Sequence, residues 1–294
     1  MFLIIHNPLS SNMKSKFKTY LMVRFFKKNH IPFNLRSTLK IDNLNEYLED
    51  NPAITDVLFL GGDGSINHLI NNVDINRITQ NIYLGKSGSG NDFLRSLKKK
   101  GSGNITIGEA VTDKGTTKFI NGCGAGIDAM VCYYVNIDKK KRRLSYFFNV
   151  FKAMVTFKSC AVDITIDGMD YHYEKCYFVA VQNGKYFGGG MKVAPSADVE
   201  SDEYQICIAH SMSKALLQFV LMSVYSGMHV HLKKYVSIHT GKEISVKFAE
   251  KRYFQAEGEV WKDVSGFTVN KCASHPFIAF DKRKVKKALP KTSS

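Results

Sequence analysis

A glycine-rich stretch that follows a buried strand constrains this chain more than any other feature. The apolar run Val57–Leu60 leads directly into Gly61-Gly62-Asp63-Gly64-Ser65, and apolar residues then recur with helical spacing at Ile66, Leu69, Ile70 and Val73. The expected order is strand, glycine loop and amphipathic helix. Glycines permit left-handed backbone and close approach of a ligand, and a helix start offers unpaired N–H groups. The stretch therefore predicts a phosphate site, with a plain strand-to-helix turn as the alternative.

Strands and helices alternate through the first third of the chain. Strands are expected at residues 2–5, 31–36 and 54–60, and helices at about residues 15–28 and 44–48. Such alternation indicates parallel βαβ units, which bind ligands at the carboxyl ends of their strands. Asn7, Thr38 and the glycine stretch all lie at expected strand ends.

A second loop of small residues repeats this design. The expected strand Ile82–Leu84 runs into Gly85-Lys86-Ser87-Gly88-Ser89-Gly90-Asn91-Asp92, and an apolar-periodic helix follows. Two such loops at one edge of a parallel sheet could hold a polyphosphate between them. A capped turn that faces solvent is the alternative interpretation.

The pattern changes after about Asp113, where short strand-like runs separated by turn signals replace the alternation, two of them at residues 244–248 and 252–256. These runs predict a mostly antiparallel β domain, with helical spacing at residues 144–157 and 213–225. An apolar segment at residues 277–280 precedes a basic tail, which suggests a last strand that returns to the first domain. We therefore expect an α/β domain at residues 1–112, joined by the tail at 277–294, and a β domain at 113–276.

Charge and cysteine usage limit the partners and the compartment. The chain of 294 residues carries a formal net charge of +15, which favours anionic partners, although no nucleic-acid recognition motif supports nucleic acid as the partner. Its six cysteines show no paired or metal-binding spacing, so reduced thiols in a cytoplasmic protein are expected. With neither a signal peptide nor a membrane-spanning segment expected, any membrane contact should be peripheral.

The glycine stretch resembles the GGDGT-x-N signature of the soluble diacylglycerol kinase catalytic family, which includes bacterial lipid kinases and is related to sphingosine and ceramide kinases. Further family motifs follow in the expected order. They are Asn7-Pro8, Gly88–Phe93 for GTGNDF, Gly124–Ala129 for GxGxDA, Arg143–Tyr146, Asn183–Met191 and Ala256–Glu259. The resemblance covers nearly the whole chain.

The resemblance implies a fold and a nucleotide site. The implied fold is an α/β nucleotide-binding domain with a parallel sheet, similar to that of NAD kinases, followed by an antiparallel β-sandwich domain. The implied nucleotide is ATP, and the residues that would bind it are Asn7, Thr38, Gly61, Gly62, Asp63, Gly64, Ser65, Ile66, Asn67 and Ser89.

The resemblance also implies a proton acceptor in a DGE turn, for which this chain has Glu257-Gly258-Glu259. Glu259 matches the family's Glu, whereas Glu257 replaces Asp and would shift a carboxylate by more than an ångström. Misplacement on that scale costs on the order of 100-fold in rate. Two exposed acids on a hairpin are the alternative interpretation.

A structural Mg²⁺ site is implied in the segment that follows Pro195. Asp202 is the carried-over ligand, with the backbone carbonyls of Val199 and Tyr204 beside it, and an ordinary turn residue is the alternative. Two departures bear on these sites. Glu203 replaces the family's Gly, and His68 replaces a Glu that follows the glycine signature in many members.

We expect an enzyme of lipid metabolism, a Mg²⁺- and ATP-dependent kinase that converts diacylglycerol to phosphatidic acid for phospholipid biosynthesis. The basic run Lys139–Arg143, beside the aromatic segment at 144–151, is expected to contact an anionic membrane. The alternatives are a kinase of a sphingoid base or phosphatidylglycerol, more remotely an NAD kinase, and a catalytically weakened nucleotide-binding or membrane-binding protein. The sequence leaves the lipid and the oligomeric state open, a homodimer included.

Overall fold

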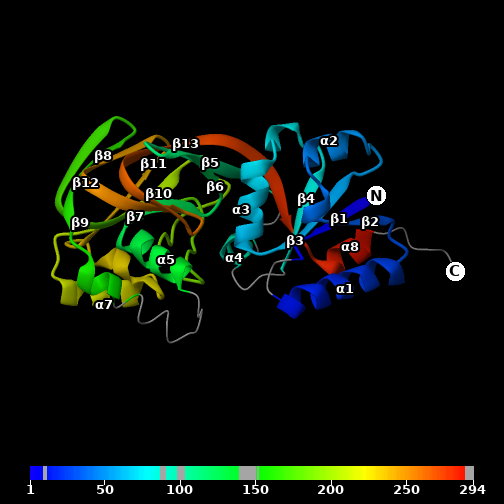
Figure 1. The fold of residues 1–294 in the computed structure, drawn as a ribbon, viewed down its shortest axis with the longest axis horizontal. Coiled ribbons are helices and arrows are strands. Elements are labelled where there is room, and N and C mark those ends of the chain that lie inside the picture. Colours follow the sequence, from blue (N-terminus) through cyan, green and yellow to red (C-terminus); the bar gives the residue numbers. More distant parts are fainter. Residues whose placement is uncertain (9–11, 87–90, 98–102, 139–149, 151, 289–294) are drawn as a thin grey trace. The chain divides into compact units, whose positions relative to one another are not determined.

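A computed structural model describes residues 1–8, 12–86, 91–97, 103–138, 150 and 152–288. The chain divides into two compact units (Figure 1). Unit 1 comprises Met1–Asn104 and Ser274–Ser294, and unit 2 comprises Ile105–Ala273. The sequence-based domain boundaries lie a few residues later along the chain at both junctions.

Unit 1 contains a sheet in which neighbouring strands run parallel. Its strands are β1 (Phe2–His6), β2 (Phe33–Ser37), β3 (Asp56–Gly61), β4 (Asn81–Lys86) and the end of β13 (Glu259–Ala279). They pair in the order β2-β1-β3-β4-β13, with Phe277–Ala279 against Ile82–Leu84. The apolar tail thus adds the strand that its sequence suggested. The carboxyl ends of β1, β2 and β3 consequently lie at one edge of the sheet.

Helices cover this sheet because the buried strand residues need apolar partners on both faces. The elements are α1 (Asn12–Lys28), η1 (Thr38–Lys40), α2 (Leu44–Glu49), α3 (Asp63–Asn72), η2 (Ile75–Arg77), α4 (Asp92–Leu97) and α8 (Lys282–Ala288). Phe26 of α1 is fully buried against Ile4 and Leu58, and its ring stacks on Phe280 at a centroid distance of 6.0 Å. Figure 1 shows α1 beside α8, with α2 on the opposite side of the strands.

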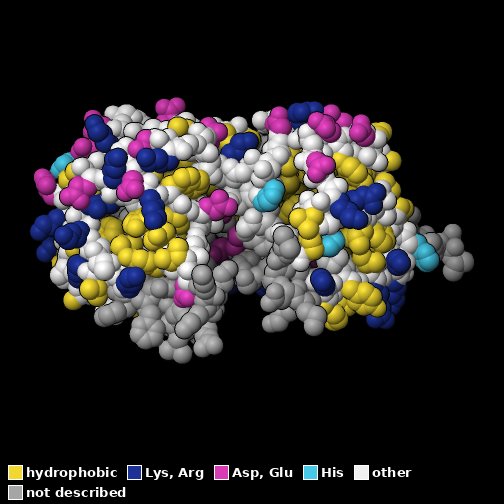
Figure 2. All heavy atoms as spheres, viewed as in Figure 1, with side chains coloured by type: hydrophobic (Ala, Val, Ile, Leu, Met, Phe, Trp, Pro, Cys, Tyr) yellow, Lys and Arg dark blue, Asp and Glu magenta, His cyan; other side chains and the backbone are white. Residues whose placement is uncertain are grey.

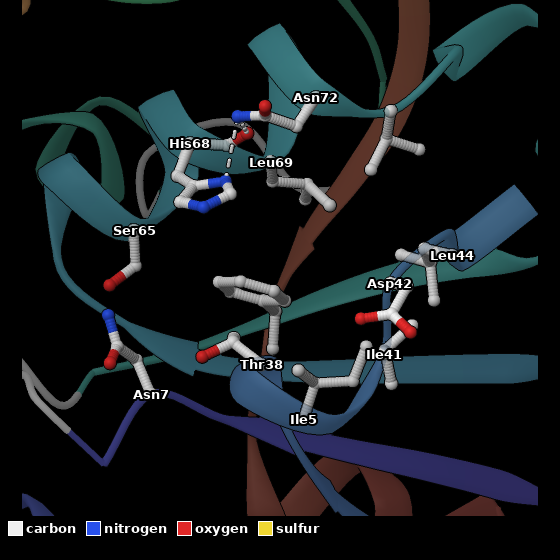
Figure 3. Close-up of a pocket in the computed structure, with 12 residues that line it drawn as sticks. Ile5, Asn7, Thr38, Ile41, Asp42, Leu44, Ser65, His68, Leu69 and Asn72 are labelled. Atoms are coloured by element: carbon white, nitrogen blue, oxygen red, sulfur yellow. Dashed lines mark hydrogen bonds between the residues drawn. The ribbon is translucent and has the colours of Figure 1, made fainter.

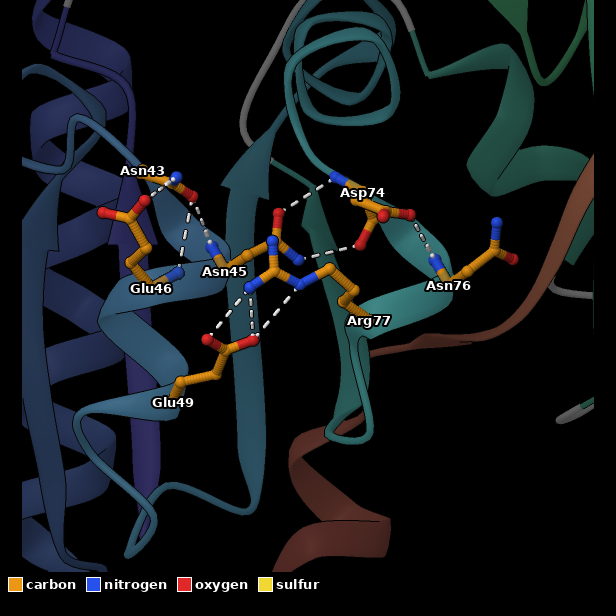
Figure 4. Close-up of polar contacts among 7 residues, drawn as sticks. All are labelled: Asn43, Asn45, Glu46, Glu49, Asp74, Asn76 and Arg77. Carbon is orange, nitrogen blue, oxygen red and sulfur yellow. Dashed lines mark hydrogen bonds and ion pairs between the residues drawn. The ribbon is translucent and has the colours of Figure 1, made fainter.

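A polar network joins α2 to η2 (Figure 4). The buried Asn45 amide donates to the Asp74 carbonyl at 2.8 Å and accepts from the Asp74 N–H at 3.0 Å. Arg77 contacts both carboxylate oxygens of Glu49, at 2.7 and 3.0 Å. Asn43 caps α2 by accepting from the N–H groups of Asn45 and Glu46. These contacts fix α2 against the segment that follows α3.

Unit 2 is built from antiparallel strands. They are β5 (Asn104–Thr112), β6 (Gly115–Phe119), β7 (Gly122–Gly126), β8 (Cys160–Ile166), β9 (Met169–Gln182), β10 (Tyr204–His210), β11 (Val236–Gly241), β12 (Ile244–Ala256) and the first part of β13. The central order is β11-β10-β9-β7-β12-β13, β8 pairs with β12 and β9, and β5 pairs with β13 and β6.

The strands of unit 2 have an apolar core on each face. Phe119, Tyr204 and Phe254 belong to the first core, which is formed by side chains of the strands. The second core lies under helices α5 (Ile127–Ile137) and α7 (Lys214–Val224), where Leu217 and Val220 are buried. A short helix η3 (Met228–His231) follows α7. All six cysteines are free.

Two sequence-based elements of unit 2 differ from the structure. The expected strands at residues 244–248 and 252–256 form one strand, β12, whose register shifts between Lys247 and Arg252. The expected helix at 144–157 is described at residues 150 and 152–157 and is helical at 150 and 152–156, and the membrane segment Lys139–Arg143 with most of its aromatic neighbour lies outside the described residues. Among the described helices, none combines the length and the apolar content that a bilayer crossing requires.

Candidate functional site

The glycine stretch forms a tighter junction than its sequence suggested. Strand β3 ends at Gly61, Gly62 caps the helix with extended backbone, and α3 begins at Asp63. None of Gly61, Gly62 and Gly64 has a positive φ, so none of them uses the left-handed backbone that glycine permits. Gly61 is instead required for packing, because a Cβ there would lie 2.4 Å from the Ser65 Cβ. A Cβ on Gly64 would meet no atom within 4 Å.

The Asp63 side chain links this junction to the second loop. Its Oδ2 accepts from the N–H of Asp92 at 2.9 Å and its Oδ1 from the N–H of Phe93 at 3.2 Å. These are the first two residues of α4, whose orphan N–H groups need acceptors. Burial raises the pKa of Asp63, and the two backbone hydrogen bonds oppose that rise. Asp63 therefore caps a helix and joins the two loops.

A pocket lies at the carboxyl edge of the unit 1 sheet (Figure 3). Asn7 follows β1, Thr38 follows β2 and Ser65 lies in the first turn of α3, and Figure 3 shows their side chains converging at one end of the pocket. The rest of its lining is mostly apolar and comprises Ile5, Ile41, Asp42, Leu44, Phe59, His68, Leu69, Asn72 and Val73. A ligand with an apolar ring at one end and polar groups at the other would match it.

The other predicted nucleotide-binding residues have different surroundings. Ile66 is a core residue with 1% of its surface exposed. Asn67 is buried, and its carbonyl and amide oxygens accept from the Asn71 amide at 3.0 and 2.7 Å. Gly61, Gly62, Asp63 and Gly64 do not line the pocket but form the junction beside Ser65. Ser89 lies outside the described residues.

Three polar pocket residues, Asp42, His68 and Asn72, were absent from the sequence-based set. His68 Nδ1 lies 2.8 Å from the Asn72 amide nitrogen, and the dashed line in Figure 3 marks this contact. Helical spacing could have identified two of them. Residues 65, 68, 69, 72 and 73 lie at i, i+3, i+4, i+7 and i+8 and so share one face of α3.

In unit 2, Glu257 and Gly258 form the two-residue turn between β12 and β13, with φ values of 53° and 87°. The Glu257 Oε1 accepts from the N–H groups of Ile120, Asn121 and Gly122 at 2.8, 2.6 and 3.3 Å. Its Oε2 accepts from the Asn121 amide at 2.9 Å. Glu257 therefore anchors the turn through both oxygens, whereas Glu259, the first residue of β13, is exposed.

Around this turn lies a cluster of polar side chains, which we call the polar cluster. Its members are Asn121, Asp128, Gln182, Asn183, Gln255 and Glu257. Within the described part of the chain, both polar atoms of the Gln182 amide and the Oδ1 atoms of Asn121, Asp128 and Asn183 are buried without a hydrogen-bond partner. Such atoms are rare in native structures and call for a ligand or water.

Asp128 is a titratable member of the polar cluster whose pKa is shifted. Burial raises its pKa to about 6, opposed by its own helix-start N–H groups and by the Gln255 amide. That amide donates to Asp128 Oδ2 at 3.4 Å. A carboxyl with a perturbed pKa and an unpartnered oxygen is typical of functional sites. The sequence showed Asp128 only as part of a family motif.

Two of the three expected Mg²⁺ ligands Val199, Asp202 and Tyr204 have other partners in the structure, namely the Val199 carbonyl and the Asp202 carboxylate. The Lys271 ammonium is 2.5 Å from Asp202 Oδ1, and this ion pair lowers the pKa of Asp202. The Val199 carbonyl accepts from the Thr106 N–H at 2.9 Å. A second cation beside Asp202 would be repelled by the ammonium. Across the described residues no group of three His, Cys, Asp or Glu side chains is placed to hold a metal.

Comparison with known families divides the chain into two adjoining domains. The model of the diacylglycerol kinase catalytic domain matches residues 1–121. The model of the YegS C-terminal NAD kinase beta sandwich-like domain matches residues 122–270. Together they confirm an N-terminal α/β domain followed by a β-sandwich-like domain.

Individual relatives are distant in sequence. A protein of Bacillus subtilis (strain 168) with the provisional name lipid kinase YtlR is 24% identical over 263 residues, 81% of each chain. A diacylglycerol kinase of Mycobacterium tuberculosis (strain ATCC 25618 / H37Rv) is 23% identical over 207 residues, 65% of this chain and 66% of that one. A crystal structure of a protein from Bacillus anthracis str. Sterne, provisionally named a diacylglycerol kinase, superimposes with a TM-score of 0.71 at 17% identity, covering 95% and 96% of the two chains. This last likeness shows a shared fold.

Proposed function

The chain belongs to the diacylglycerol kinase catalytic-domain family of lipid kinases, and on that premise we propose that it transfers the γ-phosphoryl group of ATP to a lipid hydroxyl, that of diacylglycerol. The observation that carries the proposal is the pocket of unit 1. There Asn7, Thr38 and Ser65, from three separate strand ends, converge beside the start of α3. Parallel α/β sheets bind nucleotides at this edge.

The chemistry of the pocket supports a nucleotide as its ligand. Ile41, Leu44 and Leu69 offer an apolar surface for a base, and the Asp42 carboxylate can accept hydrogen bonds from ribose hydroxyls. The Thr38 and Ser65 hydroxyls can donate to phosphate oxygens. The start of α3 adds unpaired N–H groups and the positive end of the helix dipole. Gly64 leaves that helix start without a side chain, so a phosphate can approach its backbone.

We assign the proton acceptor of the lipid hydroxyl to Glu259 and a positioning role to Glu257. Both carboxylate oxygens of Glu257 already accept backbone or amide hydrogens, which fixes the turn but engages the lone pairs that a base would use. The exposed Glu259 carboxylate follows two residues later on the same turn. Phosphoryl transfer needs chiefly in-line positioning, charge stabilisation and a group that takes the hydroxyl proton.

The polar cluster of unit 2 is proposed to bind the lipid acceptor. Diacylglycerol presents one hydroxyl and two ester carbonyls, and the cluster offers an amide donor on Gln182 together with oxygen acceptors on Asn121 and Asp128. These unpartnered buried atoms would be satisfied by such groups. Mg²⁺ is proposed to enter as the complex with ATP, where it offsets phosphate charge.

Action on a lipid requires that the protein meet a bilayer. We propose that it works in the cytoplasm as a peripheral protein on an anionic membrane surface, which the formal charge of +15 supports.

The proposal is tested by incubating the full chain with γ-radiolabelled ATP, Mg²⁺ and mixed vesicles that contain diacylglycerol, a sphingoid base or phosphatidylglycerol. Label in phosphatidic acid would support diacylglycerol as the substrate. Label in a different lipid product would keep the kinase and change its acceptor. Binding of ATP with no label in any lipid would indicate a nucleotide-binding protein without transfer activity.

A further inference from the structure

Helix α7 of unit 2 presents large apolar side chains to solvent. Phe219 and Met222 are 60% and 69% exposed, and Tyr225 and Met228 continue the series at 53% and 57%. The spacing of three residues places the first three on one side of the helix, while Leu217, Val220 and Val224 on the other side are buried in the core. We call these four exposed residues the α7 face, although Tyr225 is the C-cap of α7 and Met228 is the first residue of η3. Exposed apolar patches of this kind mark interaction surfaces.

The charged residues of the segment that carries the α7 face all have one sign. From Ser211 to Lys242 the chain contains no Asp or Glu, and its described basic residues include Lys214 at the start of α7 and Lys233 and Lys234 after η3. The Lys192 side chain lies beside Gly227, a residue that stands between Tyr225 and Met228 in the sequence. Figure 2 shows Lys and Arg side chains beside hydrophobic ones on the part of unit 2 where α5, α7 and residues 152–156 overlap in Figure 1.

We infer that the α7 face docks onto an anionic phospholipid bilayer, with its four apolar side chains in the interfacial region and the flanking lysines against the headgroups. An apolar strip in a segment whose charged side chains are all basic matches the apolar interior and the negative surface of such a bilayer. Lysine side chains can lie along the interface with their ammonium groups towards the phosphates. The inference rests on the proposed lipid kinase activity, because the substrate of that activity is held in a bilayer. It identifies the surface of unit 2 that contacts the bilayer.

Vesicle sedimentation tests the inference with the full chain. The double variant Phe219→Ser/Met222→Ser should lower partitioning onto phosphatidylglycerol vesicles at least tenfold. Met169→Ser is the matched control, because Met169 is equally exposed at 60% but lies in the β8–β9 hairpin, and it should bind as wild type does. Lys233→Gln/Lys234→Gln should lower binding severalfold and reduce its dependence on salt. Phosphatidylcholine vesicles should bind wild type weakly.

The outcomes separate this inference from the proposed function. With a short-chain diacylglycerol dispersed in solution, Phe219→Ser/Met222→Ser should transfer phosphate at the wild-type rate, which shows an intact fold and site. If wild type phosphorylates no lipid but its vesicle binding depends on Phe219 and Met222, the proposed function fails and the docking surface stands.

Three results would overturn the inference. One is wild type that does not sediment with phosphatidylglycerol vesicles. Another is unchanged binding by the α7 variant while Phe17→Ser/Tyr20→Ser, which alters the exposed residues of α1, abolishes it. The third is a wild-type dimer, seen by light scattering, that the α7 variant converts to a monomer with vesicle binding unchanged, since a second copy would then cover the α7 face.

Discussion

The carboxylate of Asp63 caps the helix that Asp92 begins, with 2.9 Å between Asp63 Oδ2 and the Asp92 backbone nitrogen. Through this bond, the acidic residue of the glycine junction fixes the end of the second small-residue loop of unit 1, where α4 begins. The acid in this stretch is therefore explained by a structural contact with the neighbouring loop. It is not a pocket-lining residue.

Asp63→Ala should lower the free energy of unfolding of unit 1 by about 1–2 kcal/mol, because two N–H groups of α4 lose their acceptor. Chemical denaturation followed by circular dichroism measures the loss. Asp42→Ala is the control, since Asp42 is an exposed carboxylate of the pocket lining. It should leave stability unchanged and weaken ATP binding. Equal stability of the two variants would contradict the capping role of Asp63.

Gly64→Ala and Gly61→Ala should differ in their effect on thermal stability. A Cβ on Gly64 meets open space, so Gly64→Ala should keep or slightly raise the thermal midpoint. The same Cβ would displace a phosphate bound at the helix start, so ATP binding should weaken at least tenfold. A Cβ on Gly61 would clash with Ser65, so Gly61→Ala should lower the thermal midpoint. Calorimetric titration with ATP and a melting curve test both. Wild-type ATP affinity in Gly64→Ala would place the phosphates elsewhere.

Asp128 should make stability fall with rising pH over a defined window. Its pKa is about 6 in the folded chain against an ordinary value of 3.8, so the folded state holds the proton more tightly. The stability from this group is fully present below pH 3.8 and is lost as pH rises through about 6. Asp128→Asn, which keeps an oxygen for Gln255, should therefore melt at the wild-type temperature near pH 4. It should melt higher, by on the order of 3 °C, near pH 7.5. A difference in melting temperature that does not change with pH would exclude this role.

Because Lys271 pairs with Asp202, the stability of the 199–204 segment should not depend on Mg²⁺. We expect the wild-type melting temperature to be the same in Mg²⁺ and in EDTA, since the ammonium already neutralises Asp202. Lys271→Met should gain stabilisation by Mg²⁺, about 1.4 kcal/mol at a concentration ten times its Kd. Lys262→Met removes a lysine that contacts Tyr133 and should not respond. Destabilisation of wild type by EDTA would show that a metal does bind at Asp202.

Local sequence patterns predicted the elements of this fold better than the contacts between them. Apolar periodicity located β3 and α3, and the change of pattern near Asp113 indicated the second domain. The two expected strands at residues 244–248 and 252–256 are one strand, β12, with a register shift between them. Apolar periodicity does not predict this shift, because a bulge changes which residues face each other without changing the composition.

The candidate site was predicted in part for the same reason. Asn7, Thr38 and Ser65 could be placed together because parallel strands bring their carboxyl ends to one edge. The contacts of Glu257 with Asn121 and of Lys271 with Asp202 join residues 136 and 69 positions apart. No short-range pattern reports such pairs. The resemblance to a family suggested a metal at Asp202, but the lysine that pairs with it was visible only in the structure.

The most direct test of the account is the rate at which label from γ-radiolabelled ATP enters phosphatidic acid in diacylglycerol vesicles, compared between wild type, Glu259→Gln and Glu257→Gln. We predict that wild type transfers label, and that Glu259→Gln folds with the wild-type melting temperature but transfers label at least 100-fold more slowly. Glu257→Gln should melt at a lower temperature, because the amide nitrogen cannot accept the N–H groups that its carboxylate accepts. Wild-type transfer by Glu259→Gln would contradict the assigned proton acceptor, and wild type that binds ATP without labelling any lipid would contradict the lipid kinase itself.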